Sequence, residues 1–539
     1  MMQKGPIDSS HMSHKYVIGL LMFAVFLTGL GWLAVLPIGE GFDELTYYGY
    51  IQELADTRTL SIYRASYLSQ DVIAYHERLP TAYSSVPPFE DLKGGVTYRR
   101  FFSSPVPKEA LDTINGERNY VPSDALCYIA QHPPVFYAVM APVYLLSKHW
   151  TWKAQMAILR TVSWAFAFVG YVLGIVATIK YWPESNAVKV AAISAAWPFL
   201  IPMFFPEMAR LGSDSLCLLI IGGIWWMLLK IFAGKTRSKR RDLWILGVLL
   251  GVGLLTKAFF IPVTVGVALI LILWGDRKGL AIIVIASFAI GCPWYLHNLL
   301  STGVLTGGQE QVQLAKQGGL IDGLARNFSV YGLARGLAAV LATTVWAGTF
   351  SLARFHEWFL VPLAALLTVP VTACGVRLTC AQRGDFIWAP ALIVLLFAAG
   401  LIQHVFVALA MTGVGNNTPG WYLHVLTVPL GFIYALGLLW LIKFGYARLV
   451  LIALTLYSIG YFAVVSWVQI AMYAGCVSKE GSVKYYAFPE GGSCLLDVGR
   501  IVRNLSIISE PYIGIPLLFG GIVLGVMGLA MLYSYLMRG

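Results

Sequence analysis

The stretch that decides the fold is YVIGLLMFAVFLTGLGWLAVLP, residues 16–37, followed by IGEGFDE at residues 38–44. The first part holds no charged residue and exceeds the ~20 apolar residues that a helix needs to cross a bilayer. It is long for the apolar core of a signal peptide, and its end lacks the small-residue cleavage pattern. We therefore predict a retained transmembrane helix that leads directly into two adjacent carboxylates, Asp43 and Glu44.

The composition of the whole chain agrees with a membrane location. Of 539 residues, 58% are hydrophobic and 12% are charged, whereas a soluble domain carries about 25% charged residues. The surface of a water-soluble globule needs more polar groups than this, so a soluble enzyme is excluded. The net charge of +11 indicates basic cytoplasmic loops. The lipid bilayer is therefore an expected partner, and nucleic acid is not.

Apolar segments of sufficient length recur along the chain and predict an all-α polytopic membrane protein with about twelve transmembrane helices. After the first, they are 155–181, 188–206, 212–233, 241–257, 258–274, 278–298, 357–378, 386–411, 422–443, 447–473 and 512–536. Pro133–Leu146 has only 14 apolar residues and is predicted as an interfacial or re-entrant helix. If it does not cross, the basic cluster at 235–241 falls on the cytoplasmic side together with both termini.

This assignment divides the chain into four parts and places a long first loop, 38–132, on the outer side of the membrane. That loop carries 13 of the 27 acidic residues and 8 basic ones, so most of the basic excess is an orientation signal. The parts are a cytoplasmic N-terminus at 1–15, where 9–12 resemble a vector-derived segment, a transmembrane module at 16–300, an outer loop with a re-entrant helix at 301–356, and a second module at 357–539 with an outer loop at 474–511.

Cysteine spacing and nucleotide motifs give no cofactor site. The seven cysteines form no CxxC pair or metal-spaced cluster. Cys476 and Cys494 lie 18 residues apart in the last outer loop, where an oxidising compartment allows a disulfide and free thiols are an equal alternative. No cofactor is required. Asp43, Glu44 and Asp214 are able to ligate a divalent cation if they converge, although no spacing demands one.

The strongest candidates for chemistry are Asp43 and Glu44. A carboxylate at this boundary can meet a polar substrate and a lipid-borne one together, which suits a general base. The structural alternative is that one of the two caps the helix that follows. Apolar residues of 47–54 recur at i, i+3, i+4 and i+7, so we predict an amphipathic helix along the membrane directly after the pair.

Two further polar residues stand at expected membrane boundaries. His132 precedes Pro133 and Pro134, and prolines at a helix start hold the entry rigid. A structural role for this histidine is as plausible as a substrate contact. Arg160 lies near the outer end of the second span, where it either snorkels to the interface or pairs with an anion.

The remaining candidates come from span ends on the same predicted face. If the hinge 206–215 is helical, one face of it carries Glu207, Arg210 and Asp214, with an internal ion pair as the structural alternative. The others are Lys257 at the turn after the fifth span, His297 at the end of the seventh, and Tyr422 and His424 at the start of the tenth. Tyr422 also suits the interfacial aromatic belt. The cations would suit a phosphate attached to a lipid.

Taken in order, these motifs resemble the GT-C glycosyltransferases, a superfamily that includes protein O-mannosyltransferases, lipid A aminoarabinose transferases and mycobacterial arabinosyltransferases. The resemblance covers about 16–300 and more loosely 357–443. It rests on the acidic pair, the long loop closing in His-Pro-Pro, Arg160, the Arg-Leu-Gly-Ser-Asp-Ser hinge, a Thr-Lys turn and a Pro-Trp-Tyr span end. A departure is Trp421, where family members often present an arginine, so that either His424 substitutes or the contact is absent.

The resemblance implies transfer of a sugar from a polyprenyl-phosphate donor to a hydroxyl of a glycan, lipid or protein acceptor in the cell envelope. Asp43 would be the base of an inverting reaction and Glu44 would shape the sugar site, while Arg160, Arg210 and Lys257 would stabilise the departing phosphate. The site would face the periplasm from the inner membrane. A retaining mechanism with Glu44 as nucleophile stays open, and a lipid or solute transporter or flippase is the alternative function.

Overall fold

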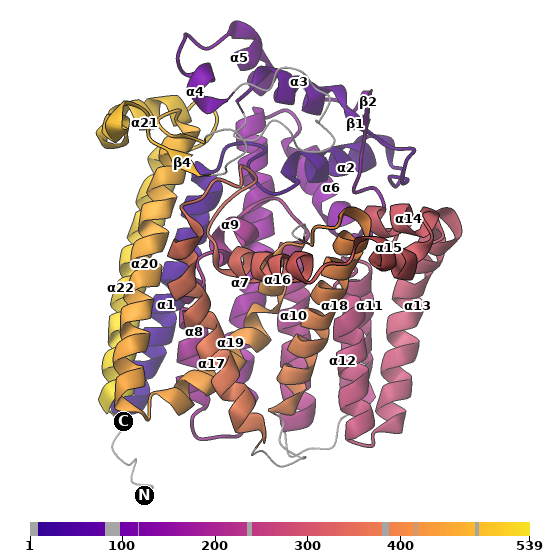
Figure 1. Ribbon diagram of the computed structural model, residues 1–539, viewed down its shortest axis with the longest axis vertical. Helices are drawn as coiled ribbons and strands as arrows, with labels where there is room; N and C mark the ends of the chain where they lie inside the picture. The colour runs from indigo at the N-terminus through magenta and orange to yellow at the C-terminus, as the bar shows by residue number, and fades with distance from the viewer. Residues whose placement is uncertain are drawn as a thin grey trace, which may run out of the picture.

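The computed structural model describes residues 9–80, 97–116, 118–233, 240–379, 387–415, 418–479 and 485–538. Residues 235–239 of the predicted basic cluster lie outside these ranges. The described chain is almost entirely helical, and its long helices run side by side as one bundle (Figure 1). The helices of the bundle are α1 (Ser9–Val35), α7 (Trp152–Tyr181), α8 (Ala187–Leu200), α10 (Asp214–Leu228), α11 (Arg240–Leu254), α12 (Phe260–Leu273), α13 (Arg277–Thr302), α17 (Val361–Thr379), α18 (Trp388–Thr412), α19 (Thr427–Leu441), α20 (Gly445–Tyr473) and α22 (Pro511–Arg538).

The predicted spans correspond to these twelve helices, but they are not all long enough to cross a bilayer. Nine helices of the described chain pass that test, or ten if the bent pair at 319–345 forms one span. The predicted spans at 188–206, 241–257 and 258–274 are α8, α11 and α12, with 14, 15 and 14 residues. The predicted count of twelve is therefore not confirmed, although the three shorter helices lie among the long ones (Figure 1).

The first and last helices pack against each other in antiparallel fashion. Glycines at their contact let the backbones approach: a Cβ at Gly31 would lie 2.5 Å from the Cα of Leu518, and one at Gly521 would lie 2.6 Å from the backbone nitrogen of Thr28. Small residues at helix contacts are common where helices pack in membranes. The start of α1 and the end of α22 therefore lie at the same end of the bundle (Figure 1).

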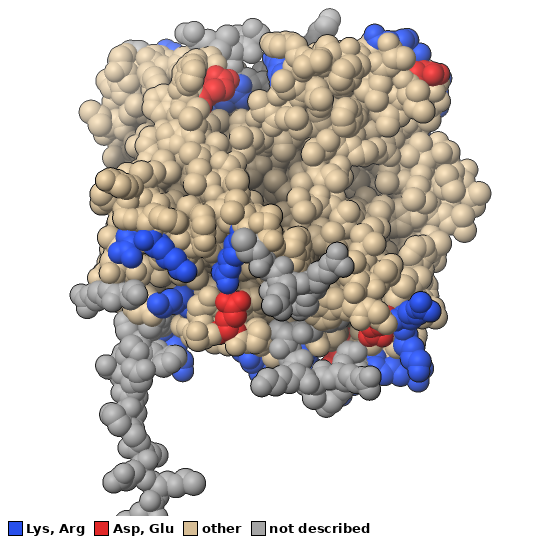
Figure 2. Space-filling view, turned by 60° about the horizontal axis from the view of Figure 1, so that its bottom comes forward, with Lys and Arg blue, Asp and Glu red and all other residues tan. Residues whose placement is uncertain are grey.

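Basic side chains gather at that end. Figure 2 shows Lys and Arg predominating over Asp and Glu around the bottom of the bundle, below a belt without charged residues. The helix ends that supply them include Lys180 on α7, Arg240 and Arg241 on α11, and Arg277 and Lys278 on α13. This distribution has the polarity that positive-inside loops produce.

The opposite end of the bundle carries a layer of short elements. Those of the first loop are α2 (Glu44–Thr57), β1 (Tyr67–Ser69), α3 (Gln70–Arg78), α4 (Tyr98–Phe101), α5 (Lys108–Asn115) and β2 (Pro122–Leu126); α6 (Val135–Ser147) follows this loop, and α9 (Phe204–Ala209) lies between α8 and α10. Strand β1 pairs antiparallel with β2, Tyr67 opposite Leu126, which neither hydropathy nor motifs predicted. The short apolar helix predicted at 133–146 is observed as α6.

Helix α2 differs from the predicted amphipathic helix. Eleven of its 14 residues are buried, among them polar Gln52 and Glu53, so it has no broad wet face. The reason is that α6 packs on it and the β1–β2 segment covers it from outside. The apolar spacing in the sequence marked the face toward the bundle, while loop residues far away in sequence bury the other face.

The later outer segments lie near the same end. The loop at 301–356 contains α14 (Gln309–Lys316), α15 (Gly319–Asn327) and α16 (Val330–Val345). Helices α15 and α16 are bent by 110°, and α16 lies across the bundle rather than along it (Figure 1). The remaining short elements adjoin the long helices in sequence. Three of them are continuous with α10, α17 and α19: η1 (Leu229–Ala233), η2 (Glu357–Leu360) and η3 (Gly420–Leu426). The others lie between α20 and α22: β3 (Ser478–Lys479), β4 (Tyr486–Ala487), η4 (Pro489–Leu496) and α21 (Val498–Leu505).

Two glycines bring α7 and α10 into backbone contact, and these two helices carry charged residues of the site described below. A Cβ at Gly170 would lie 2.3 Å from the carbonyl oxygen of Leu218, and one at Gly222 would lie 2.2 Å from that of Gly170. Backbone atoms cannot turn away as side chains do. The spacing of the two helices is therefore set by the absence of side chains at these positions.

We predict that Gly222→Ala separates α7 from α10 and lowers thermal stability by about 1–3 kcal/mol, the usual cost of overpacking. The neighbouring Gly223→Ala is the matched control, because its Cβ would meet only Leu249 at 3.4 Å and alanine favours helix. Thermal unfolding of both variants in detergent tests this. Equal melting temperatures would contradict the packing described.

Candidate active site

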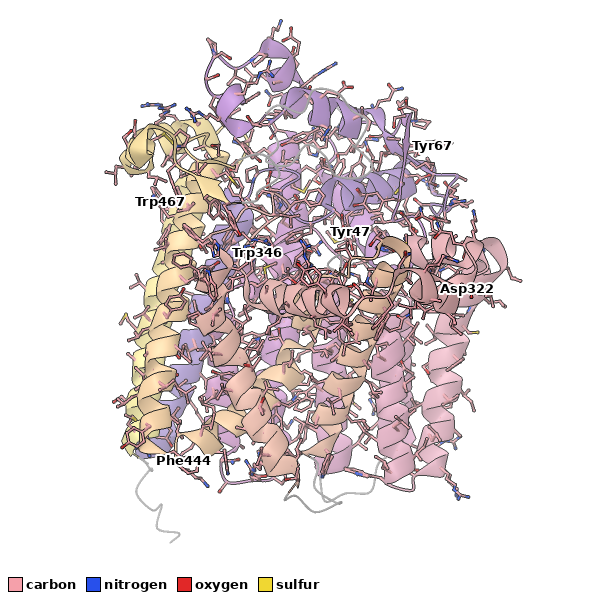
Figure 3. All side chains as sticks on the ribbon, in the orientation of Figure 1. Tyr47, Tyr67, Asp322, Trp346, Phe444 and Trp467 are labelled. Atoms are coloured by element: carbon pink, nitrogen blue, oxygen red, sulfur yellow. A yellow bond between two sulfur atoms is a disulfide. The ribbon has the colours of Figure 1, made fainter. Side chains whose placement is uncertain are left out.

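The charged residues predicted from the sequence meet near the end of the bundle that the first loop covers. Tyr47, on α2, marks this region, and Phe444 marks the opposite end (Figure 3). The side chains come from the turn between α1 and α2, the upper part of α7, the hinge before α10 and the turn between α11 and α12. Segments that lie far apart in the sequence therefore form one polar cluster.

Glu44 and Arg160 form a buried bidentate ion pair. Arg160 donates from Nε to Oε1 of Glu44 at 2.8 Å and from Nη2 to Oε2 at 2.5 Å, and both side chains are at most 3% exposed. The backbone nitrogens of Leu211 and Gly39 each donate to Glu44 at 3.0 Å. Burial alone raises the pKa of Glu44, but Arg160 and these N–H groups bring the pKa below its ordinary value.

The remaining donors of Arg160 end on the carbonyl groups that follow α1. Nη1 donates to the carbonyl oxygens of Leu33 and Leu36, and Nη2 to that of Pro37 at 2.7 Å. The last carbonyls of a helix lack partners within it, so the guanidinium caps α1 as well as pairing with Glu44. Arg160 thus pairs with an anion of the protein itself, and this geometry favours a positioning role for both residues over substrate contact.

Asp43 has a different environment from its neighbour. Its backbone is left-handed, with φ 56° and ψ 15°, and its side chain makes no capping bond to α2, so the capping alternative does not describe it. The side chain is partly exposed and accepts a hydrogen bond from the hydroxyl of Tyr128. Left-handed backbone is uncommon for residues other than glycine, and such strain is concentrated at functional sites.

A second buried network links Glu207, Arg210, Asp214 and Lys257. Arg210 donates to Glu207 at 2.7 and 3.2 Å and to Asp214 at 2.8 Å, and Lys257 donates to both oxygens of Asp214 at 2.8 and 3.0 Å. The hinge is not one continuous helix, because α9 ends at Ala209 and α10 begins at Asp214. The predicted helical spacing therefore does not apply, while the ion-pair alternative describes the network.

Aromatic rings surround the two cations of this network. The ammonium of Lys257 lies 4.3 Å from the ring centroid of Phe259 and 4.8 Å from that of Tyr422. The guanidinium of Arg210 lies 5.6 Å from the ring of Tyr47 and donates to the carbonyl oxygen of Phe42 at 3.0 Å. Rings at such distances attract cations and exclude water. Tyr422, a predicted candidate at its span end, therefore lies in contact with Lys257 of this network.

Burial changes the protonation of two groups beside these cations. It raises the pKa of Glu207 to about 8, although Arg210 opposes the shift. Burial, together with the nearby charge of Lys257, lowers the pKa of His132 to about 3. At neutral pH His132 is therefore uncharged. Its Nδ1 lies 3.2 Å from the hydroxyl of Tyr137, and its ring centroid lies 6.2 Å from that of Tyr47.

Two predicted residues occupy other places. The buried His424 has Nε2 2.9 Å from the carbonyl oxygen of Thr344, at the end of α16, and belongs to that helix contact. His297 is exposed and lines a separate cavity. Trp421, where the resembled family often has an arginine, stacks on Phe42 at 4.1 Å between ring centroids. A ring contact next to Asp43 thus replaces a charge at this position.

Sequence reasoning missed Tyr128 as a partner of Asp43 and Tyr47 as a centre of the cluster. The hydroxyl of Tyr47 lies 3.2 Å from Oγ of Ser213, which connects α2 to the hinge. Tyr128 stands four residues before the singled-out His132, so proximity to that motif was the available signal. The spacing of Tyr47 predicts that it belongs to the apolar face of a helix. That pattern gives no indication of the contact that its hydroxyl group makes.

The cysteine and metal predictions have different outcomes. Cys476 and Cys494 form a disulfide in the segment between α20 and α22. In the described ranges, no group of three His, Cys, Asp or Glu residues is placed to hold a metal ion. Of the three carboxylates considered for a divalent cation, Glu44 is paired with Arg160, and Asp214 with Arg210 and Lys257.

Comparison with known proteins gives similarities of structure alone. Family models and curated protein sequences yield no match. ArnT from Cupriavidus metallidurans, solved with bound undecaprenyl phosphate, aligns with 97% of this chain and 76% of its own, at a TM-score of 0.47 and 14% identity. AglB, an oligosaccharyltransferase from Archaeoglobus fulgidus solved with an inhibitory peptide and a dolichol-phosphate, aligns with 86% of this chain at a TM-score of 0.44 and 12% identity.

The alignment with AglB covers 57% of that protein, so this chain spans little more than half of its length. At this level of identity the likeness concerns the fold, and we infer the function below from the site residues.

We predict that Glu44→Gln lowers the free energy of unfolding by about 3–5 kcal/mol, because Arg160 is left as a buried charge without its anion. Glu510→Gln is the matched control: Glu510 pairs with Lys153 at 3.1 Å while 39% exposed, and an exposed pair contributes about 1 kcal/mol or less. Denaturation of purified protein in detergent compares them. Similar decreases in the free energy of unfolding for the two variants would show that the buried pair contributes no more to stability than the exposed one.

Proposed function

We propose that the chain is a membrane glycosyltransferase that moves a sugar from a polyprenyl-phosphate donor to a hydroxyl group of an acceptor, with Asp43 as the general base. In this reaction the acceptor oxygen attacks the anomeric carbon, its proton passes to the base, and the lipid phosphate leaves. Such chemistry needs a free carboxylate and, beside it, a cation in a dry environment.

The observation that carries the proposal is the contrast between Asp43 and the other carboxylates of the site. Within the described residues Glu44, Glu207 and Asp214 are each bound to a cation, whereas Asp43 pairs with none and is partly exposed. The Tyr128 hydroxyl orients one of its oxygens, which leaves the second oxygen for a substrate proton. A general base needs this combination of access and fixed orientation.

Lys257 is the best-placed residue for the departing phosphate. An ammonium has three N–H groups, and in the described part of the chain both of its hydrogen bonds end on one carboxylate, that of Asp214. A donor therefore remains for a phosphate oxygen, and the rings of Phe259 and Tyr422 keep the charge desolvated. Arg210, by contrast, already donates to Glu207, Asp214 and Phe42.

The donor class is tested by the lipid that accompanies the protein. Mass spectrometry of lipids copurified with the intact chain should detect a polyprenyl phosphate or its glycosylated form, and the attached sugar would name the donor. Copurification of phospholipid alone, together with no binding of added undecaprenyl phosphate, would count against the proposal and favour a different membrane function. Incubation of the protein carrying its glycosylated lipid with envelope extracts then identifies the acceptor as the molecule that gains the sugar.

We predict that Asp43→Asn reduces sugar transfer by about 100- to 10,000-fold, the usual contribution of a general base. Asparagine tolerates left-handed backbone, so folding and undecaprenyl phosphate binding should be unchanged. Asp124→Asn, an exposed carboxylate of the same loop, is the control and should transfer at the wild-type rate. Wild-type transfer by Asp43→Asn would remove Asp43 from the mechanism.

A pH dependence follows from Glu207. Below pH 8 its carboxyl is protonated, so Arg210 and Lys257 face a single negative charge, that of Asp214, and the network is net positive. Above pH 8 Glu207 ionises and this excess disappears. The charge of a lipid phosphate is steady over this interval, because its second pKa is about 6.

We therefore predict that undecaprenyl phosphate binds at least about three-fold more weakly at pH 9 than at pH 7. Glu207→Gln should abolish that decrease. Glu184→Gln, which changes a carboxylate near Arg377 at the other end of the bundle, should keep it. Equal pH profiles for wild type and Glu207→Gln would exclude Glu207 as the titrating group.

A further inference from the structure

A cavity of about 310 Å³ lies beside the candidate active site. Its walls come from the first outer loop, from the segment before α6, from the outer end of α13 and from α14. The residues that define its chemistry are Tyr63, Arg64, Gln131, Trp294, His297 and Lys316. The functional proposal above does not use this cavity.

The described residues that line the cavity include the cations Arg64 and Lys316 and no carboxylate. Arg64 and Lys316 make no ion pair with any described residue, and both are exposed. The guanidinium of Arg64 lies 5.3 Å from the ring centroid of Tyr63, and its backbone is left-handed, with φ 62°. Two cations converging on a hollow favour an anionic ligand.

A buried amide gives the second, independent observation. Gln131 lines the cavity and is 7% exposed, yet its Oε1 has no hydrogen-bond partner among the described residues. A buried acceptor without a partner is costly and is rare in native proteins. A hydroxyl group of a ligand would satisfy this oxygen, so the cavity offers a site for a hydroxyl as well as for an anion.

Other wall residues are held in place by the same segment. The Trp294 indole donates to the carbonyl oxygen of Gln131 at 3.2 Å, and the Asn298 amide donates to the same oxygen at 3.4 Å. Ser301 donates to the carbonyl oxygens of His297 and Asn298, which leaves its oxygen as an acceptor toward the cavity. Polar acceptors beside aromatic rings in a preformed hollow are typical of sites for small polyhydroxylated ligands.

The chain between Tyr128 and His132 connects the cavity to the active site. Tyr128 holds Asp43 and His132 contacts the cluster around Tyr47, while Ala130 and Gln131 line the cavity. Consecutive Cα atoms are 3.8 Å apart, so Ala130 lies within about 8 Å of Tyr128. The cavity therefore adjoins the side of the site that holds the base, where an acceptor must lie.

We propose that this cavity binds a sugar unit bearing a phosphate or carboxylate group, as part of the acceptor. Arg64 and Lys316 bind the anionic group, Gln131 accepts a hydrogen bond from a sugar hydroxyl, and the rings of Tyr63 and Trp294 contact the apolar faces of the sugar. The statement that this sugar belongs to the acceptor rests on the function proposed above. The statement that the cavity binds an acidic sugar is independent of that function, because it requires only the residues of the cavity.

The test measures binding to the purified full chain in detergent, by calorimetry, with four probes: glucose 1-phosphate, glucuronate, methyl glucoside and inorganic phosphate. The two acidic sugars should bind at least about ten-fold more tightly than methyl glucoside and than inorganic phosphate. Arg64→Ala/Lys316→Gln should weaken their binding about ten-fold or more. Arg100→Ala/Lys108→Gln removes the same charges from exposed positions on α4 and α5 and should leave binding unchanged.

Three results would overturn the proposal: equal binding of acidic sugars to the wild type and to Arg64→Ala/Lys316→Gln, binding of methyl glucoside as tight as that of the acidic sugars, or binding of inorganic phosphate as tight as that of glucose 1-phosphate. Asp43→Asn should bind the acidic sugars like wild type. A further result is that the wild-type protein binds acidic sugars, loses that binding in Arg64→Ala/Lys316→Gln, and yet transfers no sugar. This result would support the cavity as a binding site for acidic sugars and would contradict only the proposed glycosyltransferase activity.

Discussion

The buried pair of Glu44 and Arg160 is the constraint on which the arrangement of the site depends. Through four acceptor bonds Glu44 holds Arg160 and the backbone of Gly39 and Leu211, and Arg160 holds the carbonyls that end α1. One ion pair thus joins the first helix, the loop after it, α7 and the hinge before α10. Two charges out of water are stable only when such bonds satisfy them, so these four segments must come together for any one of them to be placed.

The two adjacent acids consequently have opposite physical roles. Glu44 has no free lone pair and cannot approach a substrate without losing its partners. Because that residue is fixed, the backbone just before it must turn sharply, and the left-handed conformation of Asp43 directs its side chain toward Tyr128 and the accessible side. Strain at one residue is therefore balanced by the many bonds of the next one. If the chain were shifted by one residue, so that Asp43 took the position of Glu44, the ion pair with Arg160 and the accessible carboxylate would both be lost.

The sequence supports the fold class and the set of charged residues at the site better than it supports their partners. Apolar length located all the bundle helices, because hydrocarbon demands it, but not which of them are too short to cross alone. Arg160 was predicted to snorkel or to pair with an anion, and Glu44 to take part in chemistry or to cap a helix. Their pairing joins positions 116 apart in sequence, and no local pattern encodes such a contact. The sequence could not predict the role of Gln131 for the same reason. Whether its side-chain oxygen has a hydrogen-bond partner depends on the residues that the fold brings together around the cavity.

The antiparallel contact between α1 and α22 has a consequence for the biogenesis of the protein. Helix α1 is synthesised before α22, so the face of α1 around Gly31 lacks its partner until α22 has been made. Long-range contacts of this kind form late and slow the final assembly. Since α1 also ends at the carbonyls that Arg160 caps, closure of the bundle and completion of the polar cluster become a single late event. A nascent chain released before α22 would carry every charged residue of the cluster and still lack its support.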